Sequence, residues 1–220
     1  RSMACGFNGA RMHEKVFEPR YLYHADRLGY LLWGEWPNWG LDTSKLAGLP
    51  DMLEEWAQEV ERDYSHPAVI GWCPFNETWD FGGRKQEDSF LRVVYRMTKH
   101  LDPTRPCIDT SGNYHVVTDI FDVHDYDQNP VSFRQRYAEA PDAAEANRRY
   151  GDSRTDHPEM KHRQTYRGEP YFVSEYGGIG WTKEEKAWGY GNMPKSEEEF
   201  IERFRGLTSA ILDNPRIMGL

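Results

Sequence analysis

The feature that most constrains this chain is a regular alternation of short apolar runs with longer amphipathic segments. Short apolar runs are typical of buried strands, and apolar residues spaced three and four apart are typical of helices. When the two alternate along a whole chain, they predict repeated βα units around a parallel sheet. The expected strands, most of which end in a polar residue, are Cys5–Arg11, Tyr30–Glu35, Val69–Asn76, Pro106–Thr110, Ile120–His124, Pro170–Glu175 and Ile217–Leu220.

Four helices are expected between these strands, and local signals delimit them. Pro19 suits a first helical turn and Gly29 a helix end, while Ser196 and Glu199 form a capping box. Asp102 precedes a proline, which pushes it out of the helical region and ends the third helix. The four expected helices run from Glu18-Pro19 to Gly29, from Pro50, from about Gln86 to Leu101, and from Ser196. The last of them is expected to bury Phe200, Phe204, Leu207 and Ile211 as a core stripe.

The strand count predicts the architecture. Seven candidate strands are one fewer than a closed (β/α)₈ barrel needs, and the first and last lie at the chain ends. The expectation is therefore an α/β fold, an incomplete (β/α)₈ TIM barrel running from about strand 2 to the start of strand 8. Residues 1–220 would form one catalytic barrel domain, cut short at both ends, with a charged excursion on the rim at 138–166.

Composition excludes several classes of partner. Acidic residues outnumber basic ones by 36 to 27, which argues against a nucleic acid as the main partner. No apolar run approaches the roughly 18 residues that cross a bilayer, so no membrane partner is expected. The three cysteines are too few for a disulfide framework. The 8 Trp, 13 Tyr and 10 Phe residues favour a site that stacks against a sugar.

Two of the expected strands deliver a glutamate at the carboxyl end. The segment HPAVIGWCPFNE ends in Asn76-Glu77, and EPYFVSEYGG places Glu175 before two glycines. In a (β/α)₈ barrel these strand ends converge on one mouth. Two facing carboxylates suit glycoside hydrolysis, and a retaining pair needs its carboxyl groups roughly 5–5.5 Å apart.

Several segments together resemble the catalytic barrel of glycoside hydrolase family 2. They are GFNGAR followed by His13, ADRLGYLLWGE, HPAVIGWCPFNE, DPTRP and VSEYGG, and they occur in the family's order. The resemblance covers nearly the whole chain and implies a retaining, exo-acting, β-galactosidase-like hydrolase of terminal β-linked sugars. It also implies flanking β-sandwich domains in the full-length protein.

The resemblance assigns roles that composition and spacing cannot. It implies Glu77 as general acid/base and Glu175 as nucleophile, Asn76 as a partner of the sugar 2-hydroxyl, Arg11 as the group that orients Glu175, and Tyr126 as a donor toward it. The expected substrate-binding residues are Arg11, His13, Asn76, His124, Tyr126, Trp36, Trp79 and Trp181. The other tryptophans, Trp33, Trp56, Trp72 and Trp188, are expected to be packing residues.

The chain also departs from the family pattern. Metal-binding β-galactosidases carry a glutamate and a histidine shortly after the third strand, where this chain has Trp36, Trp39 and Leu41. We therefore expect no metal ion, and no cofactor. The spacing between Arg11 and His13 is one residue shorter than in some members, which weakens the role implied for His13.

Two other interpretations stay open. The chain could be a catalytically silent barrel fragment with a sugar-binding or structural role, because an open barrel exposes two sheet edges. It could also be an endo-acting retaining glycanase that shares the barrel and the Asn-Glu strand. Individually, Glu77 and Glu175 could be exposed loop acids, and His13 and His124 could be satisfied core histidines.

Overall fold

The structure is a computed structural model that describes residues 1–78, 86–138, 163–182 and 187–220. The backbone separates into two compact units. The described residues of the first unit are 1–78, 86–120 and 163–165, and those of the second are 121–138, 166–182 and 187–220. Among the described residues, no helix is both long enough and apolar enough to cross a membrane.

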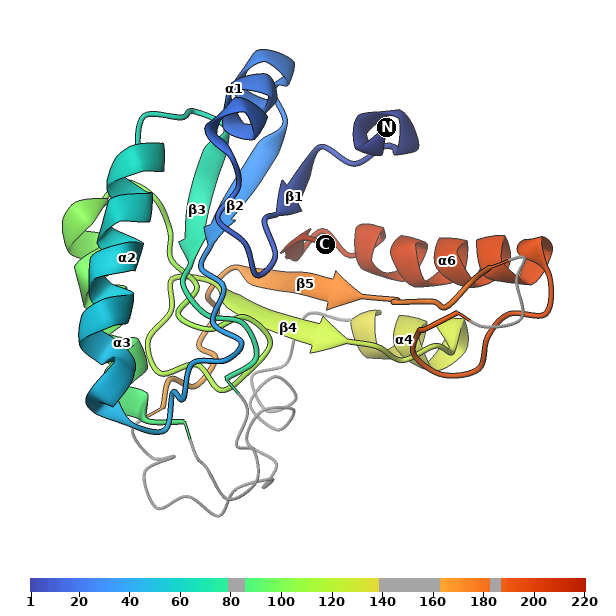
Figure 1. The fold of residues 1–220 in the computed structure, drawn as a ribbon. Coiled ribbons are helices and arrows are strands. Elements are labelled where there is room, and N and C mark those ends of the chain that lie inside the picture. Colours follow the sequence, from blue (N-terminus) through green and yellow to red (C-terminus); the bar gives the residue numbers. More distant parts are fainter. Residues whose placement is uncertain (79–85, 139–162, 183–186) are drawn as a thin grey trace. The chain divides into compact units, whose positions relative to one another are not determined.

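The first unit is a parallel three-stranded sheet with helices packed on it (Figure 1). The strands, in sheet order, are β1 (Gly9–Arg11), β2 (Leu31–Glu35) and β3 (Val69–Cys73). The helices are α1 (Pro19–Leu28), α2 (Leu49–Asp63) and α3 (Asp88–Leu101), with short 3₁₀ turns at Ser2–Cys5 and Leu46–Gly48. These elements confirm the expected βα order, except that the first strand begins at Gly9 and not at Cys5, which ends the 3₁₀ turn.

The helix boundaries follow the local signals in the sequence. Pro19 occupies the first turn of α1, and Gly29 ends that helix with a φ of 65°, a conformation that glycine adopts without a steric penalty. Helix α3 begins slightly later than expected, because Glu87 is its N-cap and accepts a hydrogen bond from the Ser89 amide. It ends at Leu101, before the Asp102-Pro103 pair.

Large aromatic side chains form the core of this unit. Trp56 and Trp72 are fully buried and meet edge to face, with ring centroids 5.8 Å apart. The indole N–H of Trp56 donates to Thr98 Oγ1 at 2.7 Å, and that of Trp72 donates to Asp102 Oδ2 at 2.9 Å. Each ring is therefore buried with its polar group satisfied, as expected for packing tryptophans.

The expected strand at Pro106–Thr110 is present only as two isolated parallel bridges. Cys107 bridges Trp72, and Ser111 bridges Asn76. Pro74 lies between the two bridges and has no N–H to donate, so the ladder is interrupted there. The segment still follows the edge of β3, as the βα pattern predicts.

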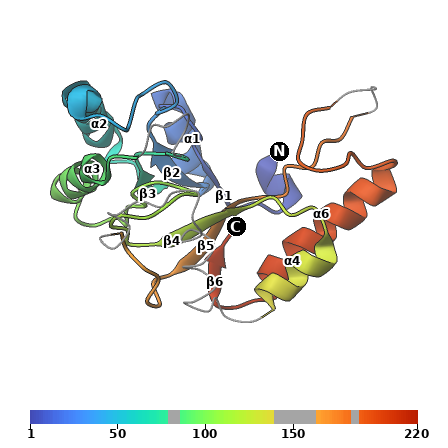
Figure 2. The ribbon, with the colours of Figure 1, turned by 90° about the horizontal axis from the view of Figure 1, so that it is seen from below.

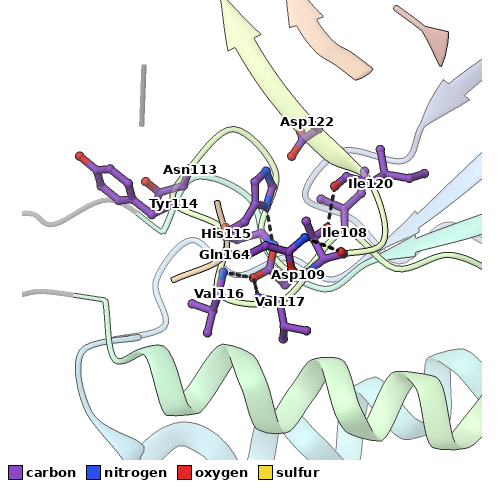
Figure 3. Close-up of polar contacts among 12 residues, drawn as sticks. Ile108, Asp109, Asn113, Tyr114, His115, Val116, Val117, Ile120, Asp122 and Gln164 are labelled. Carbon is purple, nitrogen blue, oxygen red and sulfur yellow. Dashed lines mark hydrogen bonds and ion pairs between the residues drawn. The ribbon is translucent and has the colours of Figure 1, made fainter. Parts of the chain in front are cut away.

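The loop that follows this segment is held by one buried carboxylate, shown in Figure 3. Asp109 is fully buried; its Oδ1 lies 2.8 Å from Nδ1 of His115, and its Oδ2 accepts from the amides of Val116 at 2.6 Å and Val117 at 3.0 Å. Each oxygen of the carboxylate is thereby satisfied within the loop, which fixes the turn from residue 109 to residue 117.

The second unit contains a second parallel sheet and two helices. Its strands, in sheet order, are β4 (Phe121–Asp125), β5 (Tyr171–Tyr176) and β6 (Ile217–Gly219). Its helices, which run side by side in Figure 2, are α4 (Pro130–Tyr137) and α6 (Glu197–Leu212). The capping box is confirmed in part: Ser196 Oγ accepts from the Glu199 amide, but Glu199 accepts from the Lys195 amide instead of that of Ser196.

Three features of this unit differ from the sequence expectations. Helix α4 was not expected, although Asn129 caps it and Pro130 opens it. Phe204 was expected in the core but is 39% exposed, and its ring stacks on that of the half-buried Phe200, with centroids 6.3 Å apart. Trp188 was expected to pack but is 82% exposed. Most of the expected rim excursion, residues 139–162, lies outside the described residues.

Candidate functional site

In the first unit, the carboxylate of Glu35 contacts the last residue of β1 and two of the residues that follow it. Glu35 ends β2 and is fully buried. Its Oε2 lies 3.2 Å from Nη1 of Arg11, and its Oε1 lies 3.0 Å from Nδ1 of His13 and accepts from the Glu14 amide at 2.8 Å. The charge of Arg11 offsets that of Glu35, since a buried unpaired carboxylate is costly. Sequence reasoning missed Glu35, although its place at a strand end was the available signal.

Glu14 and Trp39 form the outer part of the same cluster. Glu14 has a φ of 50°, and its Oε2 accepts from the Trp39 amide at 2.9 Å. Burial raises the pKa of Glu14, and the nearby charge of Glu35 also contributes. Trp39 is 66% exposed, and its ring meets that of His13 edge to face at 6.4 Å. An exposed indole beside polar groups is a surface on which a sugar could stack.

The Asn76-Glu77 pair follows β3 in the same unit. Arg11 Nη1 donates to Asn76 Oδ1 at 3.0 Å, which links the pair to Glu35 through one guanidinium group. The Glu77 amide donates to the Ser111 carbonyl at 2.9 Å, and Glu77 has a φ of 46°, a left-handed conformation that is costly for a residue with a Cβ atom. Strain of this kind persists only where the surroundings hold it.

The contact with Arg11 fixes which way the Asn76 amide points. A guanidinium group only donates, so the atom that faces Arg11 must be Oδ1, and Nδ2 points elsewhere. Asn76 is 1% exposed, and its Nδ2 has no hydrogen-bond partner among the described residues. A buried amide donor without a partner costs free energy unless a ligand supplies an acceptor.

In the second unit, sheet register brings three expected site residues together. His124 on β4 pairs with Glu175 on β5, and His124 Nε2 lies 3.4 Å from Glu175 Oε1. Tyr126 lies two residues beyond His124, on the same face of an extended chain. Its hydroxyl donates to Glu175 Oε2. Glu175 is half-buried, and the two contacts hold its carboxylate from two sides.

Tyr190 is a further residue of this cluster that sequence reasoning missed. Its ring stacks on that of Tyr126 with centroids 3.8 Å apart and planes 9° apart. Gly178 makes this possible: a Cβ there would lie 2.6 Å from the Tyr190 ring, and its φ of 59° suits glycine. The glycines after Glu175 were the available signal for a close approach.

The remaining expected site residues have different surroundings. Trp36 packs partly buried against the core of the first unit, and its indole N–H donates to Glu55 on α2 at 3.2 Å. Trp181 stacks on Phe200 of α6 at 6.0 Å. Trp79 lies outside the described residues. Glu77 belongs to the first unit and Glu175 to the second, so the pairing of their carboxylates stays a prediction.

The chain is similar to known β-glucuronidases in sequence. The β-glucuronidase of Sus scrofa is 31% identical over 113 residues, which are 50% of this chain and 17% of that protein. The β-glucuronidase of Rattus norvegicus is 32% identical over 104 residues, which are 46% of this chain and 16% of that protein. The matched part of this chain thus spans less than a fifth of these relatives.

Solved structures share the fold over almost the whole chain. The β-D-glucuronidase of Dictyoglomus thermophilum superposes with a TM-score of 0.69 at 19% identity, covering 99% of this chain and 38% of that one. A family 2 β-galacturonidase from Eisenbergiella tayi superposes with a TM-score of 0.66 at 18% identity, covering 99% and 37%. Residues 24–200 match the family described as "Glycosyl hydrolases family 2, TIM barrel domain". This match covers most of the chain, which therefore belongs to glycoside hydrolase family 2 and carries its TIM barrel domain.

Proposed function

We propose that the protein containing this chain is a retaining β-glycosidase with Glu175 as nucleophile and Glu77 as general acid/base. The observation that carries the proposal is the setting of Glu175, a strand-end carboxylate that receives the Tyr126 hydroxyl and lies 3.4 Å from His124 Nε2. A nucleophile must be aimed at one carbon atom, and two partners, one on β4 and one directly after it, provide that aim. Family membership supports the same assignment.

The proposed reaction is a double displacement. Glu175 attacks the anomeric carbon while Glu77 gives a proton to the departing glycosidic oxygen, and a glycosyl ester forms on Glu175. Glu77, now ionised, then takes a proton from water, which attacks the anomeric carbon and releases the sugar and the free carboxylate of Glu175. The net result is hydrolysis with retained configuration.

Asn76 would contribute through its amide donor. Because Arg11 occupies Asn76 Oδ1, the Nδ2 group is the part available to a ligand. Donation to the sugar 2-hydroxyl, an interaction that strengthens in the transition state, would satisfy this buried donor. Trp39 would offer a stacking surface near the same residues, as its exposure and its contact with His13 suggest.

The substrate we propose is a terminal β-linked sugar, cleaved in an exo manner. The similar proteins described above are β-glucuronidases and a β-galacturonidase, so they do not support the specifically β-galactosidase-like activity expected from the sequence. Uronides therefore come first in a substrate panel, followed by neutral galactosides, glucosides and mannosides.

The test uses the full-length protein with nitrophenyl β-glycosides of these sugars. We expect turnover of at least one glycoside, with retained configuration in the first product by NMR. Glu175→Ala and Glu77→Ala should each lower kcat/KM by about 10²-fold or more, whereas Glu54→Ala, an exposed position on α2, should not. A 2-deoxy-2-fluoro β-glycosyl fluoride of the preferred sugar should esterify Glu175, as peptide mass mapping would show.

Several outcomes would contradict the proposal. Inverted product configuration would exclude a glycosyl ester on Glu175, and labelling of another carboxylate would reassign the nucleophile. Sugar binding without any turnover by the folded full-length protein would favour a binding role. Release of internal fragments from a polysaccharide would favour an endo-acting glycanase.

A further inference from the structure

Asn38 makes an unusual pair of contacts with the backbone of Asn76. Its Oδ1 accepts from the Asn76 amide at 2.6 Å, and its Nδ2 donates to the Asn76 carbonyl at 2.9 Å. Asn38 is only 4% exposed and lies in the loop that follows β2. Both backbone groups of the residue before Glu77 are therefore bound by one buried side chain.

The side chain of Asn38 takes the place of a neighbouring strand. The ladder between β2 and β3 ends at the pair Glu35 and Cys73, which are 38 residues apart, and Asn38 and Asn76 have the same separation. Pro37 and Pro74 lie between these pairs and have no N–H to continue the ladder. A side-chain amide has one acceptor and one donor group in the geometry of a peptide, so Asn38 restores the pairing beyond the prolines.

A backbone segment on the other side completes the support. The Glu77 amide donates to the Ser111 carbonyl at 2.9 Å, and Ser111 forms a parallel bridge with Asn76. The peptide group between Asn76 and Glu77, which leads into the left-handed residue, is thus held by the Ser111 carbonyl at its N–H and by the Asn38 amide at its C=O. A conformation of this cost requires contacts that leave the backbone no alternative.

From this arrangement we infer that Asn38 is a positioning residue for the proton transfer by Glu77. Asn38 fixes the Asn76 backbone and thereby the direction from which the Glu77 carboxyl reaches the glycosidic oxygen. The inference rests on the proposed function, and it adds a residue that touches neither the sugar nor the reacting atoms. Loss of Asn38 should therefore impair protonation of the leaving group more than attack by the nucleophile.

The leaving group separates these two effects. A glycoside with a poor leaving group, such as a phenyl group, depends more on the acid than one with a 2,4-dinitrophenyl group, which departs without a proton. Misplacement of a reacting group by about 1 Å can cost about 10²-fold in rate. For Asn38→Ala we expect kcat/KM to fall about 10- to 100-fold with phenyl glycosides and less than about threefold with dinitrophenyl glycosides.

The experiment measures this series with the full-length protein. Asn38→Asp keeps the acceptor but replaces the donor with an oxygen that faces the Asn76 carbonyl, so its defect should have the same selectivity as that of Asn38→Ala. Asn129→Ala is the matched control, because Asn129 also holds a backbone amide through its side chain, that of Val131 at 2.9 Å on α4. Its effect should be uniform across leaving groups. A uniform loss in Asn38→Ala, or no loss at all, would overturn the inference.

A second measurement does not depend on activity. Amide hydrogen exchange should be at least about tenfold faster at Asn76 in Asn38→Ala than in the wild type, because the amide loses its acceptor. If the exchange rate at Asn76 is the same in Asn38→Ala as in the wild type, the positioning role is overturned, whatever the glycosidase activity of the protein. If the wild type turns over no glycoside but exchange at Asn76 responds as expected, the proposed function fails and the structural support by Asn38 stands.

Discussion

At the scale of single residues, two tryptophans and two glycines interlock between β2 and β3. Trp33 pairs with Gly71 across the strands, and Gly34 pairs with Trp72. A Cβ on Gly71 would lie 1.9 Å from the Trp33 ring, and a Cβ on Gly34 would lie 2.6 Å from the Trp72 ring. Each indole ring therefore occupies the space in which a side chain of the paired glycine position would lie.

This interlocking predicts that Gly71→Ala is strongly destabilising. Overpacking a close-packed core costs about 1–3 kcal/mol and sometimes more, and this contact is too short to relax cheaply, so we expect about 3 kcal/mol or more. Gly29→Ala is the comparison, since its Cβ would meet no atom and only the φ of 65° opposes it, at a cost of about 1 kcal/mol. Urea denaturation measures both.

A double variant tests the cause of the predicted loss. Gly71→Ala combined with Trp33→Leu should lose less stability than the sum of the losses in the two single variants, because a smaller side chain at position 33 makes room for the methyl group. If the two losses simply add, the clash with Trp33 is not the reason. The tryptophans were predictable as packing residues, but their glycine partners were not, because the pairing depends on strand register.

At the scale of elements, the local signals in the sequence located most helix ends correctly. Proline, glycine and capping residues act within one helical turn. Pro19, Gly29 and Ser196 therefore mark the helix ends whatever the tertiary structure around them. Helix α4 escaped prediction because its eight residues include only two buried side chains, Phe133 and Tyr137, which is too few for a clear periodic pattern.

Helix α2 carries a buried carboxyl group that predicts a pH dependence. Glu59 is 4% exposed, and neither carboxylate oxygen has a hydrogen-bond partner among the described residues. Burial raises the pKa of Glu59 from 4.5 to about 9, and the negative charge of Asp63 adds to the rise. The folded protein thus keeps Glu59 protonated where the unfolded chain ionises it.

The sign of the effect follows from these two pKa values. Below about pH 4.5 both states are protonated, and the contribution of Glu59 to stability is at its maximum. As the pH rises toward about 9, only the unfolded chain loses its proton, so each pH unit lowers the free energy of unfolding by up to about 1.4 kcal/mol. Above the folded pKa the loss is complete.

We therefore expect Glu59→Gln to flatten the stability profile between pH 5 and 9, as urea midpoints would show. Relative to its own value at pH 5, the variant should keep a few kcal/mol (~2–4) more of its unfolding free energy at pH 9 than the wild type does. Glu54→Gln, at an exposed position of the same helix, should leave the profile unchanged. Parallel profiles for wild type and Glu59→Gln would show that Glu59 does not carry the effect.

At the scale of the whole molecule, the charge balance bears on substrate choice. The chain has a formal net charge of −9, and the cluster around Arg11 contains the carboxyl groups of Glu14 and Glu35. A field of this sign repels an anionic substrate on approach and leaves a neutral one unaffected. Salt screens such interactions beyond about 10 Å at 0.1 M ionic strength.

If the proposed function holds, this charge predicts opposite salt responses for two substrates. For an aryl β-glucuronide, kcat/KM should rise about two- to fivefold as sodium chloride increases from about 20 to 300 mM, whereas that of a neutral aryl β-galactoside should change little. Steady-state kinetics of the full-length protein at constant pH measures both. A fall for the glucuronide would mean that positive groups near the bound sugar outweigh the overall charge.

The sequence by itself determined the βα order and the family, and it placed Glu77 after β3 and Glu175 near the end of β5, because these depend on residues close together in the chain. Only the tertiary structure decided that Asn38 binds the Asn76 backbone, that Tyr190 stacks on Tyr126, and that Glu59 is buried with no hydrogen-bond partner among the described residues. The physical reason is that these contacts join residues from different elements. They depend on the register between strands and on the path of the loops that follow them. No local pattern of residues encodes either feature.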